Sequence, residues 1–191
     1  MTVFETPGKH NSEETLRLAV QEARDKGISS LVVASYTGYN ASLLDGLDTG
    51  GLNIVIVTQT YGYAEVNGNP MSEEQRDALR VKGYSVVTAT HVLSGAERGL
   101  SRVFSGIYPV EILANALRMF GHGTKVCVEI STMAADAGYV RAGERVVAVA
   151  GTGRGADTAL VLRPGHGGRI LDTRIDYHIC KPIVPQVQEQ R

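Results

Sequence analysis

The stretch ERVVAVAGTGRGADTALVLRP, residues 144–164, decides how the end of the chain folds. It contains an apolar run, a turn with three alternating glycines, and a second apolar run that stops at Pro164. Alternating glycines after a strand are typical of a dinucleotide-binding turn, but that turn must open a helix whose N-terminus receives the pyrophosphate. Here a β-rich run, residues 158–162, follows the glycines. The stretch therefore argues against the dinucleotide fingerprint and predicts a β-hairpin.

Upstream of this hairpin, short apolar runs alternate with segments of helical periodicity. The apolar runs at residues 30–35, 53–59 and 84–90 are short enough for buried parallel strands. Helical segments are expected at residues 11–27, 72–83, 110–121 and 124–138, with a short helix in 36–47. This alternation predicts an α/β fold with three layers, a mostly parallel sheet between helices, and an antiparallel edge strand supplied by the hairpin.

Local signals mark where several of these segments begin. Asn11 with Glu14, and Ser72 with Gln75, have the spacing of a capping box at a helix N-terminus. Pro109 suits the first turn of the segment that follows it. RILDTRIDYHI, residues 169–179, is interpreted as an edge strand or an arm.

Composition narrows the classes of protein that need be considered. The 191 residues suit one domain, 1–191, and 43% hydrophobic with 20% charged residues is the balance of a globular protein. A net charge of -1 favours neither nucleic acid nor an anionic membrane as partner. No apolar run could span a bilayer and no secretory signal is seen, so we expect a cytoplasmic protein. Cys127 and Cys180 suggest neither disulfides nor a metal site.

The residues after each predicted strand are the candidates for ligand binding, because ligands of such sheets bind at the carboxyl ends of the strands. The first strand leads into a hydroxyl- and glycine-containing turn before a helix, which indicates either a phosphate site or an ordinary N-cap turn. The second leads into two threonines and two tyrosines that either stack on a planar ring or only cover a loop. These residues are Ser35, Tyr36, Thr37, Gly38, Tyr39 and Asn40, and then Thr58, Thr60, Tyr61 and Tyr63.

The third strand runs into a long connection, residues 90–109, and long loops are often functional. Arg98 and Arg102 are four residues apart, so a local helical turn would direct both guanidinium groups at one anion. The same segment offers hydrogen-bonding and titratable groups at His91, Ser94, Glu97 and Ser101. A solvated surface loop with an internal Glu–Arg pair is the alternative.

The glycine-rich hairpin turn is the third candidate loop. Its glycines allow a tight turn and close approach of a ligand, and its polar side chains can bind either a ligand or the turn itself. If its strand neighbours the first strand, both loops face one crevice, and a phosphorylated small molecule fits that arrangement. The residues concerned are Gly151, Thr152, Gly153, Arg154, Gly155, Asp157 and Thr158.

The order of elements, SYTGYN after the first strand and the terminal hairpin together resemble the C-terminal α/β domain of pyruvate kinase. The chain is also similar to a family of stand-alone prokaryotic proteins related to that domain. This resemblance covers about residues 3–165 and leaves 166–191 as an extension. It rests on FETPGKHNSEETL (4–16), ATHVLSGAERGLSR (89–102), YPVEILANALRMFGHGTKV (108–126) and GTGRGADTALVLRP (151–164).

The resemblance implies a five-stranded sheet of order 3-2-1-4-5 with the fifth strand antiparallel. In pyruvate kinase the corresponding two loops bind the phosphates of the effector fructose 1,6-bisphosphate, and the stand-alone family is associated with flavin mononucleotide (FMN). The barrel that performs phosphoryl transfer in pyruvate kinase is not in this sequence, so that reaction is not expected, and neither is a metal.

Three functions follow as hypotheses: an FMN-binding protein, a sugar-phosphate-binding regulatory module, and an enzyme using His91 or Glu97 on a phosphorylated metabolite. A homo-oligomer is also possible. No catalytic residue is assigned from the sequence.

Overall fold

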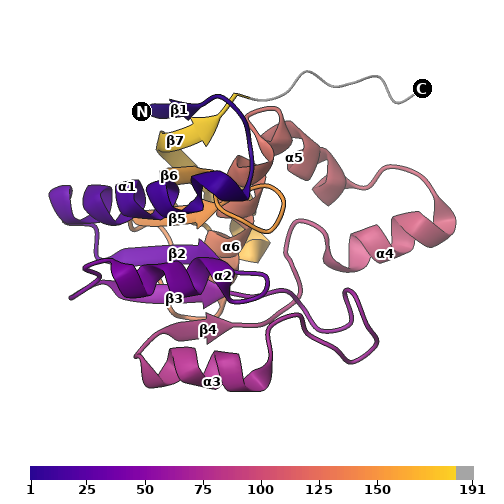
Figure 1. The fold of residues 1–191 in the computed structure, drawn as a ribbon. Helices are drawn as coiled ribbons and strands as arrows, with labels where there is room; N and C mark the ends of the chain where they lie inside the picture. Colours follow the sequence, from indigo (N-terminus) through magenta and orange to yellow (C-terminus); the bar gives the residue numbers. More distant parts are fainter. Residues whose placement is uncertain (184–191) are drawn as a thin grey trace.

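The computed structural model describes residues 1–183 and contains one seven-stranded sheet (Figure 1). The strands lie in the order β1-β7-β6-β5-β2-β3-β4. Their bounds are Thr2–Phe4 (β1), Ser30–Ala34 (β2), Asn53–Val57 (β3), Ser85–Val87 (β4), Val146–Ala150 (β5), Thr158–Arg163 (β6) and Arg174–Pro182 (β7). The β2–β3, β2–β5, β3–β4 and β1–β7 pairs are parallel, whereas β5–β6 and β6–β7 are antiparallel.

The expected five-stranded sheet is wrong in its number of strands, and its complete order therefore differs from 3-2-1-4-5. The five predicted strands lie next to one another as β4-β3-β2-β5-β6, and β7 and β1 extend the sheet beyond β6. The edge strand considered for residues 169–179 is confirmed in part: residues 169–172 belong to η3 (Gly167–Asp172), whereas residues 174–179 are the first part of β7 and pair there with β6 alone. β1 covers β7 only from Cys180 to Pro182. β1 was missed because three residues, largely exposed, carry almost no periodic signal.

Helices cover both faces of the sheet, as predicted. The helices are α1 (Ser12–Asp25), α2 (Tyr39–Ser42), α3 (Glu73–Val81), α4 (Gly95–Phe104), α5 (Pro109–Arg118) and α6 (His122–Asp136), with 3-10 turns η1 (Lys9–Asn11) and η2 (Leu43–Gly46). α1, η2 and α3 bury side chains against one face, α6 packs on the other, and α5 packs beside α6.

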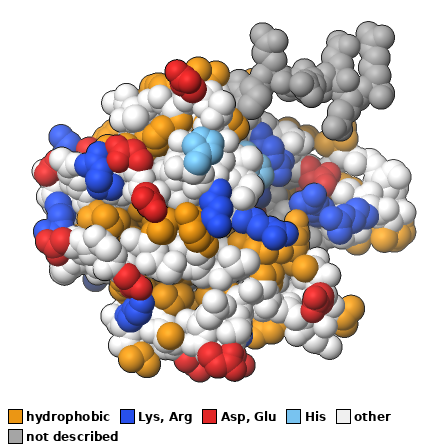
Figure 2. Space-filling view, in the orientation of Figure 1, with side chains coloured by type: hydrophobic (Ala, Val, Ile, Leu, Met, Phe, Trp, Pro, Cys, Tyr) orange, Lys and Arg blue, Asp and Glu red, His pale blue; other side chains and the backbone are white. Residues whose placement is uncertain are grey.

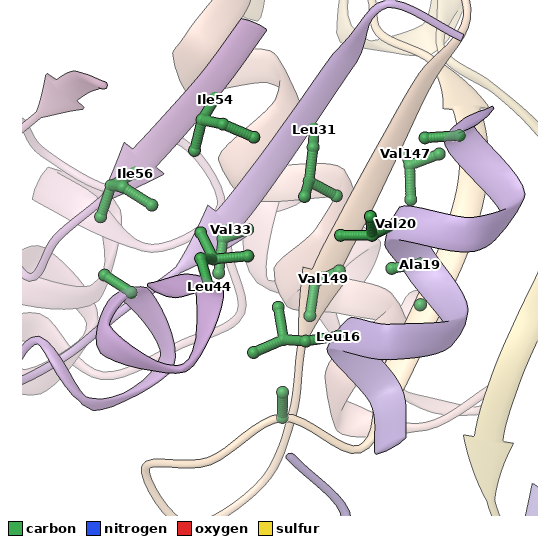
Figure 3. Close-up of a cluster of buried hydrophobic side chains, with 14 of the residues drawn as sticks. Leu16, Ala19, Val20, Leu31, Val33, Leu44, Ile54, Ile56, Val147 and Val149 are labelled. Carbon is green, nitrogen blue, oxygen red and sulfur yellow. The ribbon is translucent and has the colours of Figure 1, made fainter. Parts of the chain in front are cut away.

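Alternation along the central strands divides the core between these two faces. Leu31 and Val33 of β2 point toward α1 and η2, where they meet Leu16 and Leu44 (Figure 3). Val32 points to the opposite face, toward α6. Since both faces are covered by helices, the strands read as continuous apolar runs in the sequence.

The helix signals in the sequence had different outcomes. Ser72 and Gln75 form the predicted capping box, and Pro109 is the first residue of α5. The capping box at Asn11 is wrong, because the 3-10 turn η1 runs directly into α1 and the Asn11 amide donates to the Thr6 carbonyl oxygen. The connection 90–109 is not an open loop: it holds the ten-residue helix α4.

Candidate functional site

A cleft of about 770 Å³ lies at the carboxyl ends of β2 and β3. It extends to α4, the last residue of α5 and the first half of α6. The turn between β5 and β6 forms part of its wall, because β5 is the parallel neighbour of β2. Figure 2 shows the molecule hollowed between the sheet and the projecting α4 segment, with Lys and Arg side chains gathered along the hollow. The loops singled out in the sequence therefore do face one crevice.

One wall of the cleft is cationic. Arg98 and Arg102 project from α4, Arg118 from the end of α5, and Lys125 from the first turns of α6. Across the described residues, 1–183, no carboxylate oxygen lies within 4.0 Å of a nitrogen of any of these three arginines. Arg98 and Arg102 both line this cleft, and their binding of one anion stays a prediction.

Lys125 and Glu129 form a buried ion pair at the base of this wall. The Lys125 Nζ lies 2.6 Å from Glu129 Oε2, and the two side chains are 6% and 2% exposed. Glu129 Oε1 accepts a hydrogen bond from the Leu93 backbone N–H, and His91 Nδ1 lies 3.8 Å from Glu129 Oε2. Burial lowers the pKa of Lys125; Glu129 opposes this shift, whereas Arg118 and Arg98 add to it. An anion in the cleft would relieve that repulsion.

The N-terminus of α6 opens onto the same wall. α6 begins at His122 after Gly121, and no side chain among the described residues caps it. The first-turn N–H groups and the positive end of a 15-residue helix thus lie next to Lys125. Burial lowers the pKa of His122, and the positive charges of Arg118 and Lys125 lower it further.

The loop after β2 contributes fewer groups than the sequence suggested. Ser35, Tyr36 and Asn40 line the cleft. Thr37, Gly38 and Tyr39 do not, because the chain turns away there into α2, which is only one four-residue turn long. Ser35 Oγ accepts from the Ala41 N–H and Asn40 Nδ2 donates to the Ala34 carbonyl oxygen, so these side chains hold the turn itself.

Of the two tyrosines considered for stacking, Tyr63 lines the cleft and Tyr61 does not, and the tyrosines after β2 divide in the same way. Tyr36 and Tyr63 line the cleft and meet edge to face, with ring centroids 6.4 Å apart. Tyr39 does not line the cleft, and the Lys9 ammonium lies 3.7 Å from the centroid of the Tyr39 ring. The Tyr61 hydroxyl instead accepts a hydrogen bond from Arg76.

Thr58 and Thr60 lie at the cleft, as does His91. The Thr58 hydroxyl pairs with that of Thr88 at 2.7 Å, and His91 Nε2 lies 3.4 Å from the Thr58 carbonyl oxygen. Ser94 also lines the cleft, at the start of α4.

The hairpin turn also divides its predicted residues. Gly151, Gly153, Arg154 and Gly155 line the cleft, with the Arg154 guanidinium 5.1 Å from the centroid of the Tyr36 ring. Three others do not reach it: Thr152, Asp157 and Thr158.

Asp157 is fully buried and serves the fold. Its Oδ2 accepts from the N–H groups of Gly8 and Thr152, and its Oδ1 accepts from the Thr158 hydroxyl. It therefore ties the turn to the N-terminal segment instead of facing a ligand.

Residues 13–162 match the family model described as "Pyruvate kinase, alpha/beta domain". The chain belongs to this family. A solved pyruvate kinase from Cryptosporidium parvum is 15% identical, with a TM-score of 0.42, and the match covers 79% of this chain and 22% of that one. The same organism's pyruvate kinase in complex with ADP is 19% identical over 78% of this chain and 22% of that one, with a TM-score of 0.36.

This pyruvate kinase alpha/beta domain family member thus spans about a fifth of the length of the solved pyruvate kinases it matches. No helix within residues 1–183 is long and apolar enough to cross a membrane. The same residues hold no group of three or more His, Cys, Asp or Glu side chains suited to a metal ion.

Sequence reasoning missed the part of the site that α5 and α6 supply in this family member: Arg118, His122, Lys125 and Glu129. One signal was present. His122, Lys125 and Glu129 are spaced three and four apart and are the only titratable side chains of residues 122–135 other than Cys127, and this spacing places them on one face of a helix. Glu97, in contrast, was a candidate that the structure directs away from the cleft, since its Oε2 accepts from the Val110 N–H at 2.9 Å.

Proposed function

We propose that the cleft binds a phosphorylated small molecule, with FMN as its ligand. The observation that supports this most directly is the cationic wall: Arg98, Arg102, Arg118 and Lys125 converge there beside the N-terminus of α6. The only carboxylate among the residues lining the cleft is Glu129, and both of its oxygens are already engaged. Such an excess of positive charge favours a phosphate group.

The phosphate is proposed to bind at this wall and not in the turn from Ser35 to Asn40, where sequence analysis expected it. The polar side chains of that turn are used within it, and α2 is too short to supply a helix dipole. Tyr36 and Tyr63, on the other side of the cleft, offer aromatic surface for a planar ring.

The test is a titration of FMN followed by flavin fluorescence, with riboflavin, which lacks the phosphate, in parallel. FMN should bind saturably and much more tightly than riboflavin. Arg98→Gln should weaken FMN binding roughly 10- to 150-fold, the equivalent of about 1.5–3 kcal/mol for a hydrogen bond to a charged group. Arg141→Gln is the matched control, because Arg141 is 86% exposed and lies outside the cleft.

Equal affinity for riboflavin and FMN would contradict the role of the cationic wall. Absence of saturable FMN binding would exclude FMN, and binding of a sugar phosphate in its place would support the regulatory-module hypothesis. The third hypothesis, an acid–base enzyme, now depends on His91 alone, because Glu97 does not reach the cleft.

A further inference from the structure

Helix α4 presents three different faces. Arg98 and Arg102 lie on the face that lines the cleft. Glu97 and Ser101 face α5, where they bond the Val110 N–H and the Glu111 carboxylate. At 100° per residue, Leu100 and Val103 fall on the remaining face, and Phe104 lies between Leu100 and the α5-facing Glu97.

This third face is apolar and exposed. Leu100, Val103 and Phe104 are 46%, 73% and 71% exposed, and Ile107 just beyond the helix is 81% exposed. Figure 1 shows α4 projecting from the body of the molecule, and Figure 2 shows hydrophobic side chains along the outer edge of that projection. Single exposed apolar residues are ordinary, but a group of them on one element marks a contact surface.

α4 also lacks the packing that a short helix needs. None of its residues is buried against the rest of the described chain. An isolated helix of this length is marginal in water, and Gly95 and Gly99 lower its helix propensity further. A partner that covers its apolar face would therefore stabilise the helix.

We propose that this apolar face of α4 is an interface between two copies of the chain, related by a two-fold axis. A second copy is always available to the first, and an isologous contact lets one uncharged apolar face cover itself. The four residues together expose on the order of 500 Å², hence about 1,000 Å² for the pair of copies, which reaches the lower limit of a specific interface.

The dimer would also fix the position of part of the cationic wall, because Arg98 and Arg102 lie on the opposite face of α4. This consequence rests on the proposed function, whereas the interface itself does not. The mass of the protein in solution tests the interface without any ligand.

We would measure that mass by light scattering over a range of protein concentrations. The unchanged protein should be a dimer, and Val103→Glu should be a monomer at the same concentration. Val81→Glu, at an 89% exposed position on α3, is the matched control and should remain a dimer. Amide exchange over residues 95–104 should be slow in the dimer and fast in the Val103→Glu monomer.

A monomer at all concentrations, or a Val103→Glu variant that stays dimeric, would overturn the proposal. So would α4 amides that remain protected in a monomer. Failure of FMN to bind a protein that is dimeric through α4 would instead contradict only the proposed function.

Discussion

The first prediction concerns the buried ion pair at the base of the cleft, and it removes the positive charge of Lys125 while keeping the length of the side chain. In Lys125→Met the Glu129 carboxylate keeps its hydrogen bond from Leu93 but loses the ammonium 2.6 Å away. Because Glu129 is only 2% exposed, water solvates that carboxylate poorly. Breaking a buried ion pair in this way costs about 3–5 kcal/mol, and we expect that decrease in the free energy of unfolding.

The double variant Lys125→Met with Glu129→Gln separates charge from packing. Its glutamine Oε1 can still accept from Leu93, and no uncompensated charge remains. We therefore expect it to be more stable than Lys125→Met by at least about 2 kcal/mol, a coupling of the size found for residues in one network. Urea unfolding of the ligand-free proteins, analysed as midpoint and slope, measures both values.

Two results would refute this reasoning. One is a loss below about 1 kcal/mol in Lys125→Met, which is the range of an exposed pair. The other is a double variant no more stable than the single one, which would mean that packing, and not the isolated carboxylate, causes the loss.

Three further predictions concern pH, packing and ligand class. The pKa of His122 is lowered by burial and by the positive charges of Arg118 and Lys125. An anion bound nearby favours the charged imidazole, so His122 takes up a proton when the anion binds. Sulfate, measured by calorimetry, should thus bind more tightly as the pH falls from neutral through about 6.5 to lower values, and His122→Asn should remove that dependence. A Cβ at Gly123 would lie 2.2 Å from Thr158 Oγ1, so Gly123→Ala should lower stability by about 1–3 kcal/mol in a thermal melt, whereas Gly168→Ala, with open space around it, should not. NAD, NADP and FAD should compete far less well than FMN, because the turn between β5 and β6 opens a strand and not a helix; NAD affinity equal to that of FMN would contradict this.

The hairpin and the central strands followed from the sequence because their signals are local. Five apolar runs bounded by turn residues predicted β2 to β6, and the β-rich run after the glycines predicted that β6 is antiparallel to β5. The Ser72 cap and Pro109 likewise depend only on residues a few positions apart. Since ligands of such sheets bind at the strands' carboxyl ends, the same local signals also placed Tyr36, Arg98 and Arg154 at one cleft.

Only the tertiary structure decided which polar groups are free to act. Asp157 and Tyr61 have the chemistry of binding residues, but their hydrogen bonds go to Gly8 and Arg76, which are distant in sequence. Long-range pairing also placed β1 beside β7, although its sequence hardly differs from a coil. Lys125 joins the cationic wall only because α6 packs against the sheet beside α5. The spacing of residues along a chain determines local geometry, whereas burial and charge balance depend on segments that meet only when the chain is folded.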